Sequence, residues 1–183
     1  MTLTIVHGGQ TGADRGGHEA AIDNGWLVTG YMPRDQRDEL GKIPDAVARF
    51  LVAHEKTSYA ARTEANVQMV TAALIVVQDA NDPRATPGTA KTIDLVADRH
   101  LRRQIVDPTF DVEPIARWIW ELLVAGTLPL PLGPRESTSI QTRLLVAGPR
   151  ESKWPGARVE TAGLLRRVGR ALAAVQLERR GRP

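Results

Sequence analysis

The sequence predicts a parallel α/β fold. Short apolar runs alternate with amphipathic stretches along the chain, which is the pattern of strands and covering helices. Residues 73–78 are continuously apolar and rich in β-branched side chains, as in a strand covered on both faces. Glycine turns follow three of the expected strands. The 183 residues fit a single domain, so we expect one domain over 1–183.

The first third of the chain predicts a strand, a glycine turn and a helix in direct succession. We expect a helix over about 13–24 with Gly25 at its C-terminal cap, and a polar loop over 33–45. The expected strands in this part are 3–7 and 26–32.

The rest of the chain continues the alternation. The apolar stripe of 111–125, which includes Trp118 and Ile119, predicts a helix that packs on the core. A Pro/Gly-rich connector is expected at 126–139 and an Arg-rich C-terminal helix at about 155–180. The other expected helices are 59–71 and 87–100, and the other expected strands are 73–78, 103–107 and 143–147.

Composition excludes several classes of site. The chain has no cysteine, which excludes a disulfide scaffold, a thiolate zinc site, an iron–sulfur cluster and a cysteine nucleophile. The net charge is +3, from 24 basic and 21 acidic residues. The positive excess lies in the arginines from residue 158 on, which we interpret as a solvated helix face, and we expect no nucleic-acid partner.

The apolar runs are shorter than the roughly 20 residues that a membrane span needs. The residues at the start, 1–7, show neither a basic region nor a long apolar stretch. We therefore expect a cytoplasmic protein with no membrane partner.

The turn after the first expected strand contains Gly8, Gly9, Gln10, Thr11 and Gly12. Its spacing matches neither the GxGxxG fingerprint nor a Walker A loop. Glycines let the backbone approach a ligand, and the following helix begins with free N–H groups that attract anions. The alternative is a tight turn without a ligand.

Two charged residues follow this turn. Asp14 can cap or orient the glycine turn, and Arg15 can reach the same sheet edge. Their alternative roles are a capping carboxylate and a surface charge.

The helix expected at 59–71 carries Arg62 and Asn66 on one face, with Thr63 adjacent. A guanidinium and an amide on one face suit a phosphate or the edge of a pterin-like or purine-like ring. The alternative is a surface ion pair of Arg62 with Glu64 or Glu55.

Two more turns lie at expected strand ends or helix starts. Pro87, Gly88 and Thr89, with Thr92, place hydroxyls and N–H groups at a helix start, and the alternative is an ordinary proline and threonine start. The turn 148–152 offers one arginine and one hydroxyl for a ligand or a subunit contact. In a parallel sheet such turns share one edge, where ligands bind.

The four histidines show no metal-ligand spacing, and no HExxH motif is present. We expect no metal held by protein side chains.

Taken in order, these motifs resemble the molybdenum carrier family, a Rossmann-like group related to the lysine-decarboxylase-like, cytokinin-activating phosphoribohydrolases. The resemblance covers residues 3 to about 160. The segments that carry it are His7–Arg15, Gly30–Pro33, Tyr59 with Arg62–Val67, Pro87–Thr89 with Thr92, and Val146–Ser152.

The resemblance implies a doubly wound, mostly parallel sheet with helices on both faces, and a homo-oligomer, a dimer or tetramer. It implies a bound molybdenum cofactor (molybdopterin) or a nucleotide-like ligand, with molybdoenzymes as possible recipients. The residues that it assigns to the ligand or its support are Gly8, Gly9, Gln10, Thr11, Gly12, Asp14, Arg15, Arg62, Thr63, Asn66, Gly88, Thr89 and Thr92.

Two departures from the related families bear on function. The phosphoribohydrolase motif has a catalytic glutamate where this chain has Thr92, although Asp94 or Glu64 could substitute for it. The loop after Pro33 differs from the carrier pattern but keeps positive charge at Arg34 and Arg37, and we expect Arg34 to attract the ligand.

Three hypotheses follow. The first is a carrier that binds a phosphorylated planar heterocycle, with no catalytic residue. The second is a nucleoside monophosphate phosphoribohydrolase on the same sheet edge, and the third is a nucleotide-sensing module.

Overall fold

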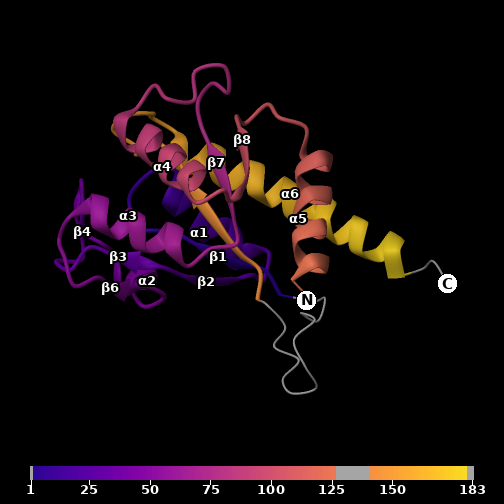
Figure 1. Cartoon of the computed structure of the whole chain (residues 1–183), viewed down its shortest axis with the longest axis horizontal. Helices are drawn as coiled ribbons and strands as arrows, with labels where there is room; N and C mark the ends of the chain where they lie inside the picture. Colours follow the sequence, from indigo (N-terminus) through magenta and orange to yellow (C-terminus); the bar gives the residue numbers. More distant parts are fainter. Residues whose placement is uncertain (1, 127–140, 181–183) are drawn as a thin grey trace.

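The computed structural model describes residues 2–126 and 141–180, and it contains a five-stranded parallel sheet (Figure 1). The strand order is β2-β1-β9-β7-β8, so the last strand in the sequence lies at the centre of the sheet. The strands are β1 (Thr4–Val6), β2 (Leu27–Thr29), β7 (Ala72–Val76), β8 (Arg102–Val106) and β9 (Arg143–Ala147). The predicted parallel α/β fold is confirmed.

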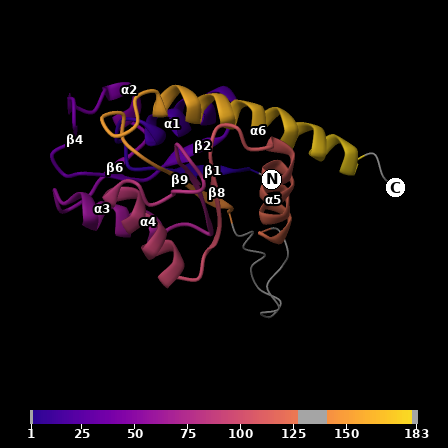
Figure 2. The same cartoon turned by 90° about the horizontal axis from the view of Figure 1, so that it is seen from above.

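Helices cover both faces of this sheet, as predicted (Figure 2). On one face lie α1 (Ala13–Asp23), α5 (Val112–Ala125) and α6 (Ala157–Arg180), whose buried side chains share one core cluster. On the other face lie α3 (Tyr59–Gln68) and α4 (Pro87–Asp98), with a second cluster. Trp118 and Ile119 belong to the first cluster, which confirms that they pack in the core.

Strand β7 shows why a continuous apolar run is needed in an interior strand of the sheet. Its five residues are all buried. Leu74 and Val76 belong to the core cluster of α1, α5 and α6, whereas Ala73 and Ile75 belong to the cluster of α3 and α4. Successive strand side chains point to opposite faces, so both sets must be apolar when helices cover both faces.

The expected strand 26–32 divides at Gly30 into β2 and β3 (Tyr31–Met32), which belong to different sheets. Gly30 has a φ of 141°, and a Cβ there would lie 2.0 Å from the carbonyl oxygen of His7. The backbone thus passes too close to His7 for a side chain at this position, and after Gly30 the chain leaves the pairing with β1 and pairs as β3 with β6 (Val52–Ala53).

The expected loop 33–45 contains more structure than its polar composition indicated. It holds the short hairpin of β4 (Arg37–Asp38) and β5 (Gly41–Lys42), and α2 (Asp45–Ala48) begins at its end. A small core cluster lies beneath this region, and its members are Met32, Ile43, Val47 and Leu51.

The other expected boundaries differ from the structure by a few residues. Gly25 follows α1 with a φ of 67°, which confirms the predicted glycine stop. Helix α6 confirms the expected C-terminal helix, whereas the connector 126–139 lies outside the described residues except for Gly126. Within the described ranges, no helix is both long and apolar enough to cross a bilayer.

The connections that follow β9 and β7 leave the sheet toward opposite faces. The chain that follows β9 enters α6 on one face, and the chain that follows β7 enters α4 on the other. A crevice opens at the carboxyl ends of parallel strands where successive connections leave toward opposite faces. The centre of this sheet therefore provides the position for a ligand site.

Candidate functional site

A cavity of about 440 Å³ lies at the carboxyl ends of the neighbouring strands β1 and β9. Its size is within the range of small-molecule sites. The turn after β1, the start of α3, the start of α4 and the turn after β9 all contribute to its wall. The predicted site residues that line it are Gly8, Gln10, Asp14, Arg62, Thr63, Asn66, Gly88, Thr89 and Thr92.

Five other predicted residues do not line the cavity. Arg15 donates to the carbonyl oxygen of Gly9 at 3.1 Å and pairs with Asp38 at 2.6 Å, so it braces the glycine turn against the β4–β5 hairpin. Arg34 is exposed and lies away from the cavity. The remaining three, Gly9, Thr11 and Gly12, lie in the turn behind the wall.

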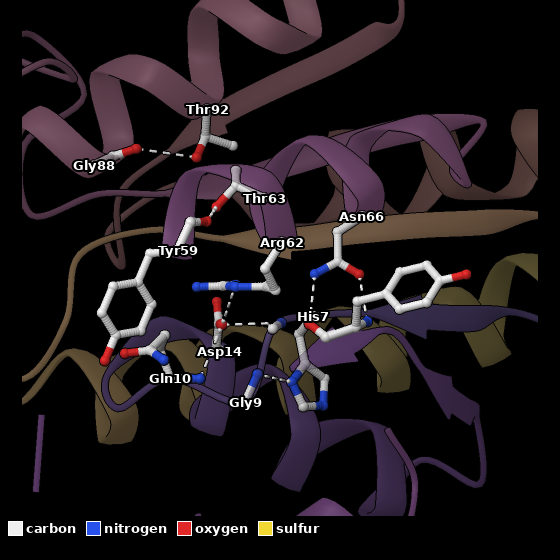
Figure 3. Close-up of polar contacts among 12 residues, drawn as sticks. His7, Gly9, Gln10, Asp14, Tyr59, Arg62, Thr63, Asn66, Gly88 and Thr92 are labelled. Carbon is white, nitrogen blue, oxygen red and sulfur yellow. Dashed lines mark hydrogen bonds and ion pairs between the residues drawn. The ribbon is translucent and has the colours of Figure 1, made fainter. Parts of the chain in front are cut away.

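The amides of the glycine turn are occupied by side chains of this chain (Figure 3). Asp14 Oδ2 accepts from the amides of Gly8 at 3.0 Å and of Gln10 at 3.1 Å. The amide of Gly9 donates to Nδ1 of His7 at 3.0 Å. The turn therefore does not present these three amides as an open anion cradle, which corrects the role expected from its glycines.

Arg62 pairs with this same carboxylate. Its Nη1 lies 3.4 Å from Asp14 Oδ2, and both side chains are more than nine-tenths buried. The guanidinium lies directly on Gly8, where an added Cβ would fall 1.4 Å from Nη1. A side chain at this position would therefore displace the guanidinium of Arg62.

Burial raises the pKa of the Asp14 carboxyl, although Arg62 and the amides of Gln10 and Gly8 act in the opposite direction. All the hydrogen bonds described for this carboxylate use Oδ2. Asp14 thus organises the turn through one oxygen and lines the cavity as well.

Two buried polar atoms at the cavity have no hydrogen-bond partner among the described residues. They are Nε of Arg62, a donor, and Oε1 of Gln10, an acceptor. Gln10 is 3% exposed and Arg62 is 8% exposed. An unpaired buried polar atom costs about 1–3 kcal/mol, so its presence in a native protein calls for an explanation. A ligand that offers one acceptor and one donor would satisfy both atoms.

Asn66 uses its side-chain amide on the backbone of β3 (Figure 3). Its Oδ1 accepts from the amide of Tyr31 at 2.7 Å, and its Nδ2 donates to the carbonyl oxygen of Tyr31 at 3.0 Å. The amide expected to read a ring edge is therefore engaged in positioning β3 against α3.

The start of α4 faces the cavity. Thr86 caps the helix by accepting from the amide of Thr89 at 3.4 Å, and Pro87 occupies the first turn. The hydroxyl of Thr92 donates to the carbonyl oxygen of Gly88 at 3.0 Å. The first-turn N–H groups of a helix lack intrahelical partners and carry partial positive charge, which suits an anion.

Three basic residues outside the predicted set of site residues line the cavity: Lys91, Arg150 and Lys153. The guanidinium of Arg150 stacks on the ring of Tyr59 with Cζ 4.5 Å from the ring centroid. The arginine of the turn 148–152 is a predicted candidate for a ligand contact, and Tyr59 belongs to the motifs that carry the family resemblance, but their spacing does not predict that the two side chains stack. This stack fixes a cation at the cavity wall.

A second polar group locks the turn after β9 in place. The carboxylate of Glu39, from the β4–β5 hairpin, accepts from the hydroxyls of Thr11 and Ser152 and from the amide of Ser152. Burial opposes ionisation here, but the hydrogen bonds from Ser152 and Thr11 prevail and lower the pKa of Glu39. Thr11 thus serves the architecture behind the cavity.

His7 and His18 form a buried pair behind the glycine turn. His7 Nε2 lies 3.1 Å from His18 Nδ1. Because the Nδ1 atom of His7 accepts from Gly9, its Nε2 carries the proton and donates to His18. Burial is the largest cause that lowers the pKa of both imidazoles, and the charges of Arg15 and Arg62 lower that of His7 further.

Acid should therefore weaken the fold. Both histidines stay neutral in the native state below their ordinary pKa of 6.5, whereas the unfolded chain binds protons there. We expect the free energy of unfolding to fall by about 1.5–3 kcal/mol between pH 7.5 and 5.5, measured by urea titration. His18→Gln should flatten this dependence, and His100→Gln, an exposed control, should not. Equal slopes in all three proteins would contradict this account.

Comparison with known proteins identifies the family. The sequence model of the circularly permutated YpsA SLOG family matches residues 5–169. The chain belongs to this family. The match includes every predicted site residue and both faces of the sheet. No match to curated proteins reaches significance.

A solved structure resembles this member of the YpsA SLOG family closely. It is a proposed molybdenum carrier protein from Syntrophus aciditrophicus SB, with 26% sequence identity and a TM-score of 0.71. The likeness covers 92% of this chain and 94% of that chain. The resemblance drawn from the motifs is thereby confirmed, as is the Rossmann-like fold.

The described residues contain no group of three or more histidine, aspartate and glutamate side chains placed to hold a metal ion. The cavity wall likewise has no histidine among its described residues.

Proposed function

We propose that this protein binds a small phosphorylated ligand with a planar heterocyclic ring and carries it without chemical change. The molybdenum cofactor and a nucleotide-like ligand are the two forms that we consider. The unpaired Arg62 Nε and Gln10 Oε1 support the proposal most directly, because they offer one donor and one acceptor to a ring edge. The solved relative, named for molybdenum carriage, supports the first form.

The chemistry of the wall fits both parts of such a ligand. Pterin and guanine share a ring edge on which a carbonyl acceptor stands beside an N–H donor and an amino donor, so either can pair with Gln10 and Arg62. The start of α4 and the side chains of Lys91 and Arg150 suit the phosphate. When bound, the cofactor would supply the metal and its sulfur ligands, and the residues of this chain would bind, orient and shield it.

The bound molecule can be identified directly. The protein should be purified from cells that make the molybdenum cofactor and analysed by native mass spectrometry, and the extract should then be oxidised. A fluorescent pterin in that extract would support the cofactor, and a nucleotide would support the second form. Protein that carries neither and binds neither GMP nor a phosphorylated pterin would overturn the proposal.

Substitution of Arg150, which lines the cavity, and of Arg34, which does not, tests whether the ligand binds in the cavity. Arg150→Gln should weaken GMP binding about tenfold in calorimetric titration, because a charge-assisted contact contributes about 1.5 kcal/mol. Arg34→Gln is the matched control and should leave affinity unchanged, since Arg34 lies away from the cavity. Equal losses in both variants would place the ligand elsewhere.

A hydrolase is the second candidate, and the observation that favours it is the carboxylate of Asp14 in the cavity wall. The two carboxylates that could have replaced the missing glutamate do not line the cavity: Glu64 is exposed, and Asp94 pairs with Arg84 on the surface. Asp14 does line it, and burial raises the pKa of its carboxyl. Release of free base from nucleoside monophosphates by the wild type, but not by Asp14→Asn, would replace the carrier hypothesis with this one.

A further inference from the structure

A second cavity, of about 510 Å³, adjoins the first. Three residues line both: Thr86, Pro149 and Lys153. Thr86 caps α4, and Pro149 and Lys153 belong to the segment between β9 and α6. The two cavities therefore adjoin at the switch between the two faces of the sheet, with Lys153 in the lining of both.

The chemistry of the wall changes from the first cavity to the second. The first is lined by the cations Arg62, Lys91 and Arg150. Past Lys153, the second is lined by hydrogen-bond acceptors that follow β7, and by a buried tryptophan of the other wall. These residues are Gln78, Asp79, Asp82 and Trp154. A phosphate suits the first wall and the shared lysine, whereas hydroxyl or amino donors suit the second.

The first cavity alone fits a mononucleotide-sized molecule, and Arg62 and Gln10, whose Nε and Oε1 are unpaired, line this cavity and not the second. A ring held by these two residues lies in the first cavity, and Lys153 is the charged residue that lines both cavities. The next group of the ligand then enters the second cavity.

We infer that the ligand has two halves joined by a diphosphate, the first a planar ring in the cavity of Arg62 and the second a hydroxyl- or amino-bearing group in the cavity of Asp82. Lys153 contacts the diphosphate between them. This inference rests on the proposed function, and it assigns the ligand to the class of nucleoside diphosphate conjugates.

Three probes of increasing length test this assignment by calorimetric titration: GMP, GDP and GDP-mannose. The wild type should bind GDP-mannose about tenfold more tightly than GMP, since a few added hydrogen bonds contribute about 1.4 kcal/mol together. Asp82→Asn should remove most of that gain and leave GMP affinity unchanged. Lys153→Gln should weaken GDP and GDP-mannose more than GMP.

The direction in which Asp82→Asn changes the affinity distinguishes a hydrogen bond to the ligand from a long-range effect of the carboxylate charge. Removal of a negative charge would strengthen the binding of every anionic probe if Asp82 acted only at long range. A loss confined to GDP-mannose marks a hydrogen bond to the sugar instead. Asp98→Asn, at the exposed far end of α4, is the control and should change none of the three affinities.

The outcomes distinguish this inference from the proposed function. If GMP does not bind, the proposed function fails together with the inference. If GMP binds and GDP-mannose binds no more tightly, only the inference fails. If GDP-mannose binds more tightly and Asp82→Asn or Lys153→Gln retains the gain, the second half lies outside this cavity, and the inference is again overturned.

Discussion

Gly148→Ala should destabilise the protein strongly or prevent its folding. An added Cβ would lie 2.1 Å from the carbonyl oxygen of Val76 and 2.8 Å from Cβ of Ala13. The first of these contacts is to the backbone of the neighbouring central strand, so β9 and β7 would have to separate at the site. We expect the free energy of unfolding, measured by urea titration, to fall by about 3 kcal/mol or more.

Gly163→Ala is the matched control. Gly163 lies inside α6, and nothing within 4 Å would meet its Cβ. Because alanine is a better helix former than glycine, this variant should be unchanged or more stable by about 0.5–1 kcal/mol. A Gly148→Ala protein as stable as the wild type would show that β9 does not pack against β7 as closely as described.

The sequence was sufficient to locate the edge of the sheet that carries the site. Apolar runs located the central strands, and parallel strands bring their carboxyl ends to one edge. The turn after β1, the start of α4 and the turn after β9 therefore had to lie near one another, although 140 residues separate Gly8 from Gly148. The cavity that they share confirms this expectation.

The direction in which polar groups point could not be predicted from the same residues. The glycines of the first turn predicted free amides, whereas Asp14 and His7 occupy them. Asn66 predicted a ring contact, whereas it pairs with Tyr31. In each case the hydrogen-bond partner depends on the path of the folded backbone, which cannot be deduced from the spacing of residues in the sequence.

The sequence likewise does not show which arginines reach the cavity. Twenty arginines and four lysines offer many candidate cations, and an exposed loop such as that of Arg34 has no feature that excludes it. Arg150 reaches the cavity because the turn after β9 places it against Tyr59, a contact between residues 91 positions apart. Only tertiary packing distinguishes these two cations.

Asp14→Ala should produce the second large loss of stability. The variant removes the acceptor of two buried amides and leaves the guanidinium of Arg62 buried without a counter-charge. Removal of one partner of a buried ion pair costs about 3–5 kcal/mol, and we expect a loss of this size in urea unfolding. The exposed pair of Arg84 and Asp94 supplies the control, and Asp94→Ala should cause no measurable change.

Arg62→Met should cost less than Asp14→Ala, because Asp14 would keep its two amide donors and, with its raised pKa, can take up a proton. In Asp14→Ala/Arg62→Met the uncompensated guanidinium is gone. The double variant should therefore be more stable than Asp14→Ala alone, which reverses the usual order of single and double variants. Additive losses would show that Asp14 acts only as a backbone acceptor and that the charge of Arg62 is compensated elsewhere.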